Sequence, residues 1–201
     1  MDKDIIESKV PELPNCIPRT GGNISRWFGL KLMSLFGWKI TGNFPNKKKM
    51  ILAVAPHTSN WDFVIGVVVK MALNLKLNFL GKHSIFIWPF SLWLRAIGGI
   101  PIDRRKSSGV VGQLVEYFNS KDTLVLALAP EGTRSKVSEW KTGFLAVANQ
   151  ANVDVVPVAL DFTNKQVVFF SARKISDDID GELEAFKALF DSKWAKFPQK
   201  F

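Results

Sequence analysis

Short apolar runs alternate along this chain with longer segments in which apolar residues recur at helical spacing. The run at 50–55 contains no polar residue, so it predicts a strand buried on both faces, as in a parallel sheet covered by helices. Further strands are predicted at 77–81, 100–102, 123–129, 153–160 and 166–172, and helices at 62–75, 108–120, 142–151 and 181–196. This alternation predicts an α/β domain over 41–201, with a mostly parallel central sheet flanked by helices.

The amino-terminal part of the chain has a different pattern. Residues 1–23 are polar and contain several prolines and glycines, which predicts a loosely structured lead. Segment 24–40 predicts an apolar helix with a few cationic or small residues, and we expect it to lie in the interface of a bilayer. A helix buried against the domain's own core fits the same pattern. The residues expected to contact the membrane are Trp27, Phe28, Leu32, Leu35, Phe36 and Trp38.

A second apolar segment lies at 84–97 and is interrupted by Pro89, which predicts two short helical pieces. Its aromatic residues fit either a second membrane-facing patch or a lid over the core. No apolar stretch is long enough to predict a helix that crosses a bilayer. Residues 1–13 carry four acidic residues and no apolar centre, so no signal peptide is expected.

Charge and composition narrow the choice of partner. The chain has 201 residues, which suits one domain, and 27 Lys and Arg against 18 Asp and Glu give it a net charge of +9. A basic surface indicates an anionic partner, and the aromatic residues fall in apolar clusters rather than among the cations, which favours a membrane over nucleic acid. Cys16 is the only cysteine, so no intramolecular disulfide can form, which fits a reducing compartment.

A histidine follows the buried strand directly. The sequence P-H-T-S-N-W-D at 56–62 places His57 at the strand's end and Asp62 at the start of the next predicted helix. The carboxylate of Asp62 can fold back onto the imidazole and fix its tautomer, which leaves the other ring nitrogen to take a proton, as in a general base. The alternative is a surface-loop histidine beside an ordinary helix N-terminal carboxylate.

Charged residues also follow two other predicted strands. Arg104 lies in a run of cations after 100–102, while Glu131 and Arg134 follow 123–129, with Lys141 a few residues later. The carboxyl ends of strands in an open α/β sheet share one edge, where ligands bind. Arginine is suited to phosphate because its planar fork can donate two parallel hydrogen bonds. A proton acceptor and two guanidinium groups on one rim predict a site for an anionic substrate with a reactive hydroxyl.

These motifs resemble those of the glycerolipid acyltransferase superfamily, typified by 1-acylglycerol-3-phosphate acyltransferases. Four blocks occur in the family's order: P-H-T-S-N-W-D at 56–62, G-G-I-P-I-D-R at 98–104, P-E-G-T-R-S at 130–135 and V-V-P-V-A-L at 155–160. The combination of H-x-x-x-x-D with E-G-T-R about 70 residues later is highly specific. The similarity covers roughly 24–172.

The resemblance implies a role for each matched residue. His57 is the implied general base and Asp62 its orienting partner. The implied substrate-binding residues are Arg104, Glu131, Gly132, Thr133, Arg134 and Lys141, of which the cations bind the acceptor's phosphate. The donor is acyl-CoA or acyl carrier protein, the acceptor a lysophospholipid, and neither a cofactor nor a metal is expected. We expect backbone amides near the His57 loop to stabilise the oxyanion.

The resemblance further implies a peripheral or monotopic protein on the cytoplasmic face of a membrane, whose partners are the phospholipid surface, the acceptor and the donor, and not nucleic acid. The segment S-K-V-S-E-W-K-T at 135–142 lacks the paired lysines of many phosphatidate-forming members. Lysophosphatidate is the first choice of acceptor, and another lyso-lipid is the alternative. A transacylase that needs no thioester and a non-catalytic lipid-binding module are the remaining hypotheses.

Overall fold

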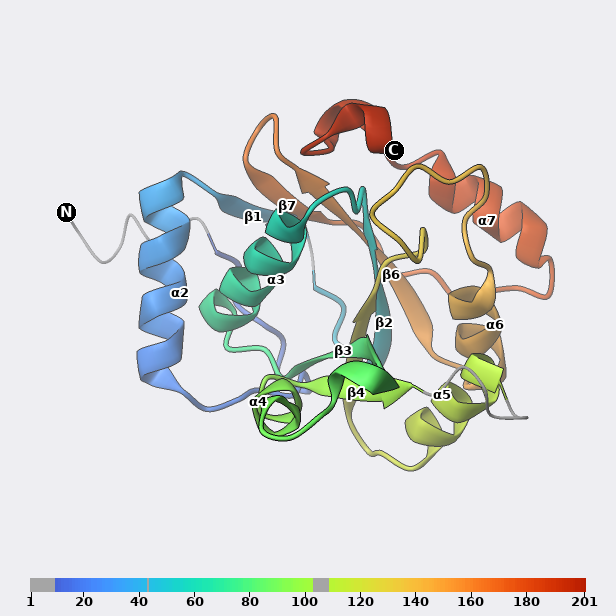
Figure 1. Ribbon diagram of the computed structural model, residues 1–201, viewed down its shortest axis with the longest axis horizontal. Helices are drawn as coiled ribbons and strands as arrows, with labels where there is room; N and C mark the ends of the chain where they lie inside the picture. The colour runs from blue at the N-terminus through green and yellow to red at the C-terminus, as the bar shows by residue number, and fades with distance from the viewer. Residues whose placement is uncertain (1–9, 43, 103–108) are drawn as a thin grey trace.

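A computed structural model describes residues 10–42, 44–102 and 109–201 of the chain. Within these residues, a seven-stranded sheet is covered by helices on both faces (Figure 1). The strands are β1 (Lys39–Gly42), β2 (Lys49–Ala55), β3 (Leu77–Lys82), β4 (Gly99–Ile102), β5 (Leu124–Leu128), β6 (Asp154–Asp161) and β7 (Gln166–Phe169). The helices are α2 (Asn23–Phe36), α3 (Asn60–Ala72), α4 (Phe90–Ala96), α5 (Gly109–Asn119), α6 (Gly143–Gln150) and α7 (Ile179–Lys187).

The sheet is mostly parallel, as predicted. Its strand order is β1-β7-β6-β2-β5-β3-β4, and among these pairs only β6 and β7 run antiparallel. β2 lies between β5 and β6, with Ile51 opposite Leu126 on one side and Val155 on the other. Its apolar sequence therefore reflects burial on both faces at the centre of the sheet.

Each face of the sheet has its own core. Helices α2 and α3 cover one face and α5, α6 and α7 the other (Figure 1). Neighbouring strand residues point to opposite faces, so Leu52 packs with the α2 and α3 side chains and Ile51 with those of the other three helices. Gly29 permits the close crossing of α2 and α3, because a Cβ at this position would collide with the backbone nitrogen of Ala72.

The predicted helix at 24–40 is shorter than expected. Gly37 takes the left-handed conformation, with φ 71°, and its N–H caps the carbonyls of the last turn, so α2 ends at Phe36. Lys39–Gly42 instead forms the edge strand β1, which pairs with β7. The expectation that Trp38 contacts the membrane is wrong in this fold, because Trp38 is only 6% exposed and its ring packs edge-on against Phe162.

The lead is also more ordered than its composition predicts. From Val10 onward the expectation of loose structure is wrong, because Val10, Leu13 and Ile17 are buried in the core beside α2 and α3. The backbone N–H of Thr20 then donates to the carbonyl of Asn74, 3.0 Å away. Three apolar side chains spaced three and four residues apart were thus a core signal within a polar segment.

One further prediction is confirmed and another is wrong. The apolar segment 84–97 does form two pieces, a 3-10 turn at His83–Ile85 and α4, which starts directly after Pro89. The predicted last helix, 181–196, is divided: α7 ends at Lys187, and a separate 3-10 turn follows at Ser192–Trp194. This division allows the carboxyl-terminal residues to turn back toward the sheet.

Candidate active site

The central strand places His57 at the carboxyl edge of the sheet. β2 ends at Ala55, Pro56 is buried, and the next residue is His57, whose side chain is 21% exposed. Its Nδ1 atom lies 3.1 Å from Oδ2 of Asp62. A hydrogen bond from Nδ1 to this carboxylate leaves Nε2 as the ring nitrogen that can accept a proton.

Asp62 also holds the loop that carries His57. Its Oδ2 accepts hydrogen bonds from the backbone N–H groups of Thr58 and Ser59, both at 2.8 Å, and its Oδ1 accepts one from the Ser59 hydroxyl at 2.9 Å. Ser59 is the N-cap of α3, and its hydroxyl oxygen accepts from the N–H of Trp61. The pair forms a capping box, so Asp62 both starts the helix and orients the imidazole.

Glu131 binds the backbone of His57, whereas Asp62 binds its side chain. It is 2% exposed, and its Oε1 accepts a hydrogen bond of 2.8 Å from the backbone N–H of His57. Its Oε2 has no hydrogen-bond partner among the described residues. Burial raises the pKa of Glu131 to about 7. Glu131 therefore positions the histidine from beneath the loop and is not among the residues that line the adjacent cavity.

A cavity of about 600 Å³ opens beside this pair. Its polar wall contains His57, Asp62 and the stretch Gly132–Ser135. The remaining wall is largely apolar and comes from α3 and the α3-facing side of the sheet, including Phe63, Val67, Leu52, Leu77, Phe79, Ala127, Val158 and Leu160. A pocket with one reactive polar end and a long apolar wall suits an amphiphilic ligand.

Of the three cations predicted to bind phosphate, one lines the cavity, one lies next to it and one falls outside the described residues. Arg134 lines the same cavity as His57, so the structure brings these two sequence-distant residues to one site. Lys141 does not line the cavity, but its backbone N–H donates to the carbonyl of Pro130, and a Cβ at Gly132 would lie 3.3 Å from its Cγ. Gly132 has φ +68°, a conformation that favours glycine. Arg104 falls at 103–108, outside the described residues.

Comparison with known proteins agrees with this geometry. The family model described as "Acyltransferase" matches residues 38–161, which include the His57 loop, Glu131 and Arg134. This chain belongs to the acyltransferase family. It is 29% identical over 160 residues to a 1-acyl-sn-glycerol-3-phosphate acyltransferase of Haemophilus influenzae, covering 75% of this chain and 65% of that protein. It is 30% identical over 139 residues to the enzyme of the same name from Streptococcus pneumoniae, covering 63% and 50% of the two chains.

A solved structure shows the same fold. The crystal structure of the 1-acyl-sn-glycerophosphate (LPA) acyltransferase of Thermotoga maritima superposes with a TM-score of 0.58 at 18% identity, over 83% of this chain and 78% of that one. This chain spans 65% of the length of the Haemophilus relative and 50% of that of the Streptococcus relative.

The backbone amides of the His57 loop already donate hydrogen bonds within the protein. The N–H of His57 donates to Glu131, and those of Thr58 and Ser59 donate to Asp62. The expectation that amides of this loop stabilise an oxyanion therefore fails for these three groups, because two carboxylates accept from them. For the acyl transfer that the resemblance implies, donors to the oxyanion are therefore expected from another part of the cavity wall.

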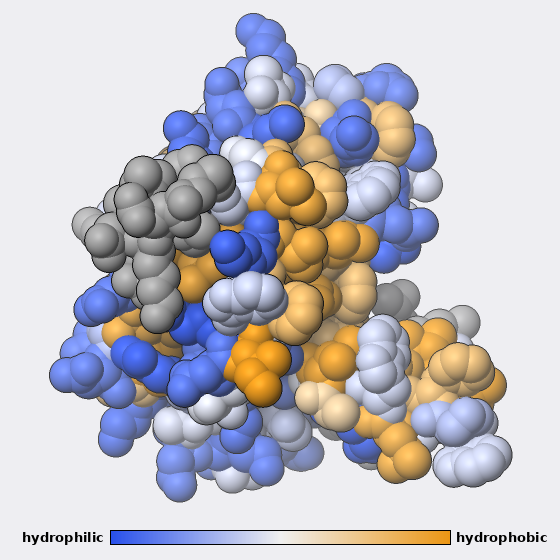
Figure 2. All heavy atoms as spheres, turned by 90° about the vertical axis from the view of Figure 1, so that its left-hand side faces the viewer, coloured by the Kyte–Doolittle hydropathy of each residue, from blue (hydrophilic) through white to orange (hydrophobic). Residues whose placement is uncertain are grey.

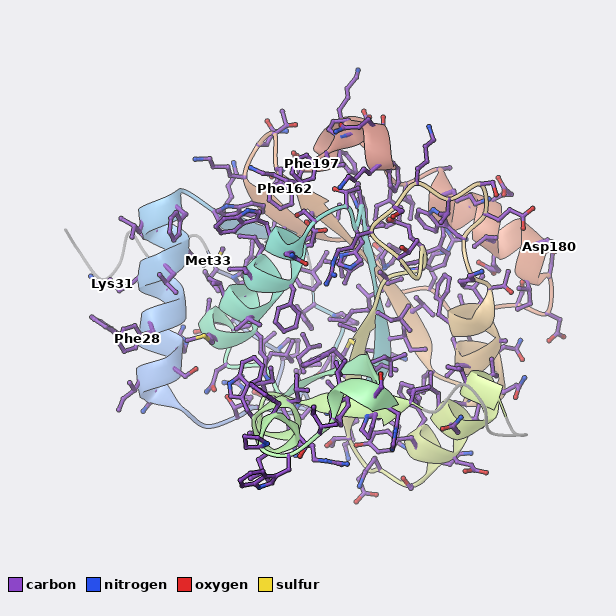
Figure 3. The ribbon with its side chains drawn as sticks, in the orientation of Figure 1. Phe28, Lys31, Met33, Phe162, Asp180 and Phe197 are labelled. Atoms are coloured by element: carbon purple, nitrogen blue, oxygen red, sulfur yellow. The ribbon has the colours of Figure 1, made fainter. Side chains whose placement is uncertain are left out.

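A contact from the carboxyl terminus was not visible in the sequence. The N–H of Phe197 donates to the Thr58 hydroxyl oxygen, 3.2 Å away and 139 positions earlier in the chain. Figure 3 shows Phe197 close to Phe162, whose own N–H donates to the carbonyl of Trp194. Their carboxyl-terminal partners, Trp194 and Phe197, lie outside the segment matched by the family model, and no local pattern in 188–201 indicates these contacts.

The described part of the chain has two apolar surface patches, on α2 and around α4. On α2, Met33 packs toward α3, while Phe28 and Lys31 point away from it (Figure 3). The α2 patch consists of the exposed side chains Ile24, Trp27, Phe28, Leu35 and Phe36, with Leu32 partly exposed. The α4 patch consists of Ile85, Ile87, Trp88, Phe90, Leu92 and Trp93, of which Trp88 is 81% exposed. Figure 2 views the α2 side and shows hydrophobic side chains gathered over the middle of that face.

Proposed function

We propose that this protein transfers a fatty acyl chain from an acyl thioester to the hydroxyl of a lysophospholipid, with 1-acylglycerol-3-phosphate as the first choice of acceptor and phosphatidate as the product. The observation that carries the proposal is one cavity lined by His57 and Arg134, with Asp62 held 3.1 Å from the imidazole and a long apolar wall behind them. The names of the relatives support this choice of substrate.

The proposed reaction begins with proton removal. His57 Nε2 accepts the hydroxyl proton as that oxygen forms a bond to the thioester carbonyl carbon. Asp62, bonded to Nδ1, holds the ring in place and stabilises the imidazolium that forms. The carbon–sulfur bond of the tetrahedral intermediate then breaks, and the imidazolium returns the proton to the leaving thiolate. Atoms and charge balance in this reaction, and no covalent acyl-enzyme intermediate forms.

Arg134 provides the anion-binding part of the site. It is exposed, lines the cavity and follows Gly132 and Thr133 in a loop directly after β5. A guanidinium at the polar end of an apolar pocket suits a phosphate attached to a lipid chain. We include Lys141 as a supporting cation because its stem lies against Gly132. Arg104 keeps the predicted phosphate-binding role.

We also propose that the protein works at a membrane surface, on the cytoplasmic face. No helix among the described residues has both the length and the apolar character needed to traverse a bilayer. The α2 and α4 patches instead present aromatic side chains at the surface, with Lys31 over the Trp27 ring and Arg95 over the Phe86 ring. Aromatic rings beside cations are typical of segments that lie in the interface of an anionic bilayer.

The decisive experiment is incubation of purified protein with a panel of lyso-lipids and with acyl-CoA or acyl carrier protein donors, read by mass spectrometry. His57→Ala should abolish acyl transfer. His83→Ala is the matched control, because His83 is exposed and does not line the cavity. Equal product from wild type and His57→Ala would refute the mechanism, and product without any thioester would indicate a transacylase.

A further inference from the structure

One side of α3 forms a continuous strip of the cavity wall. Phe63, Gly66, Val67 and Lys70 all line the cavity, and their spacing of three and four residues places them on one helix face. The helix begins at the catalytic loop and runs toward α4 (Figure 1). Lys70 is eight positions after Asp62, which corresponds to about 12 Å along the helix axis. The cavity thus extends from His57 to a lysine.

Lys70 is a cation in mostly apolar surroundings. It is partly buried, and that burial lowers the pKa of its ammonium group. The neighbouring cavity wall includes Leu75, Leu77 and Phe79. Within the described parts of the chain, the carbonyl of Ile97, 2.5 Å away, is the one hydrogen-bond acceptor that Lys70 Nζ reaches. An ammonium has three N–H donors, so two remain for a ligand or water.

Gly66 leaves the approach to Lys70 open. It lies in the middle of α3, where glycine is a poor helix former, yet a Cβ at this position would meet no atom within 4 Å. Gly66 also lines the cavity, between Asp62 and Lys70 along the helix. A larger side chain here would project into the cavity between the reactive end and the lysine.

We propose that Lys70 is a polar subsite within the acyl-binding cavity, which favours an acyl chain with a mid-chain oxygen substituent, a hydroxyl or keto group, over an unsubstituted chain of the same length. The inference rests on the proposed function, because it assigns the cavity to the acyl chain of the thioester donor. Nothing in the matched family motifs assigns a role to Lys70.

The preference follows from hydrogen bonding in a cavity that a ligand fills. An unsubstituted chain that passes Lys70 displaces water from the ammonium and offers no acceptor in return. A hydroxyl or keto oxygen at that depth accepts one of the remaining N–H groups, and hydrogen bonds to charged groups are stronger than neutral ones. An oxygen next to the thioester carbonyl lies too close to His57 to gain this contact.

The test compares three donors of equal chain length: stearoyl thioester, its mid-chain hydroxy derivative and the derivative hydroxylated beside the carbonyl. For each, kcat/KM is measured with wild type, Lys70→Met and Lys76→Met. Met has a similar length without the charge. Lys76 is exposed and absent from the cavity wall, so it is the matched control. Gly66→Leu is a second variant, because it blocks access and leaves Lys70 itself unchanged.

Wild type and Lys76→Met should favour the mid-chain hydroxy donor over stearoyl by roughly tenfold, and Lys70→Met should bring this ratio close to one. Gly66→Leu should also abolish the preference, while the donor hydroxylated beside the carbonyl should behave like stearoyl with every variant. Equal ratios in wild type and Lys70→Met would overturn the Lys70 subsite. Absence of turnover with every thioester would instead refute the proposed function, so the two failures are distinguishable.

Discussion

The buried carboxyl of Glu131 predicts an unusual dependence of stability on pH. Burial raises its pKa from 4.5 to about 7, although the hydrogen bond from the His57 N–H acts in the opposite direction. Between these two pH values the folded protein therefore holds a proton that the unfolded chain has released. The free energy of unfolding must fall as pH rises through this window, because the folded state binds more protons.

The size of the effect follows from the shift. A change of one in pKa corresponds to about 1.4 kcal/mol, so Glu131 lowers the free energy of unfolding by about 3 kcal/mol above pH 7, relative to its contribution below pH 4.5. This is a large part of the stability of a typical domain. Glu131→Gln removes the titration, and the amide oxygen can still accept from the N–H of His57.

The assay is urea denaturation of wild type and Glu131→Gln at a series of pH values from about 4.5 to 8. The substitution places a buried amide N–H₂ where Oε2 has no hydrogen-bond partner among the described residues, so we expect the variant to be less stable at the acid end. As pH rises, the free energy of unfolding of wild type should fall by about 3 kcal/mol relative to that of Glu131→Gln.

Glu139→Gln is the control, because Glu139 is an exposed glutamate that follows the same strand, and its curve should parallel that of wild type. Parallel curves for wild type and Glu131→Gln would refute the reasoning. They would mean that the Glu131 carboxyl ionises as readily in the folded protein as in the unfolded chain.

Three further predictions concern the binding groups and the helices. In the lyso-lipid assay, Arg134→Ala should raise KM for a phosphorylated acceptor at least tenfold and change KM for an unphosphorylated acceptor little. An equal rise in KM for both acceptors would contradict the phosphate role. Replacing Trp27 and Phe28 together by Ser should reduce flotation with anionic vesicles, whereas unchanged flotation would remove the α2 patch from the membrane proposal. Gly66→Ala should raise the free energy of unfolding by about 0.5–1 kcal/mol in urea titrations, because the helix gains a better former and the added methyl group meets open space; a destabilised variant would show that the space is filled.

The parts of the site that could be predicted from sequence are those that depend on neighbouring residues in the chain and on the shared edge of parallel strands. His57 and Asp62 are five positions apart, across a strand end and a helix start, so a run of apolar residues and one capping pattern were enough to place them together. Arg134 was predicted to join them because the carboxyl ends of parallel strands share an edge, and the order of β2 and β5 places them side by side.

The remaining features depend on contacts that no local pattern encodes. The hydrogen bond from His57 to Glu131 joins residues 74 positions apart, and its existence depends on the register between two strands and on how deeply the second loop is buried. Strand β1 was missed because a single residue, Gly37, ends an apolar segment that would otherwise continue as a helix. The contact from Phe197 requires the chain to turn back after α7.

Asp62 contacts the imidazole of His57 and also caps a helix, and this has a consequence for how the site is built. One carboxylate caps α3 and contacts the imidazole, so the hydrogen bonds that start the helix also fix the loop that carries His57. Glu131 completes the arrangement by accepting the one amide of 57–59 that Asp62 does not reach. The loop's backbone is thereby held by two acidic side chains, so in the proposed reaction the stabilisation of substrate charge falls to the wall that contains Arg134.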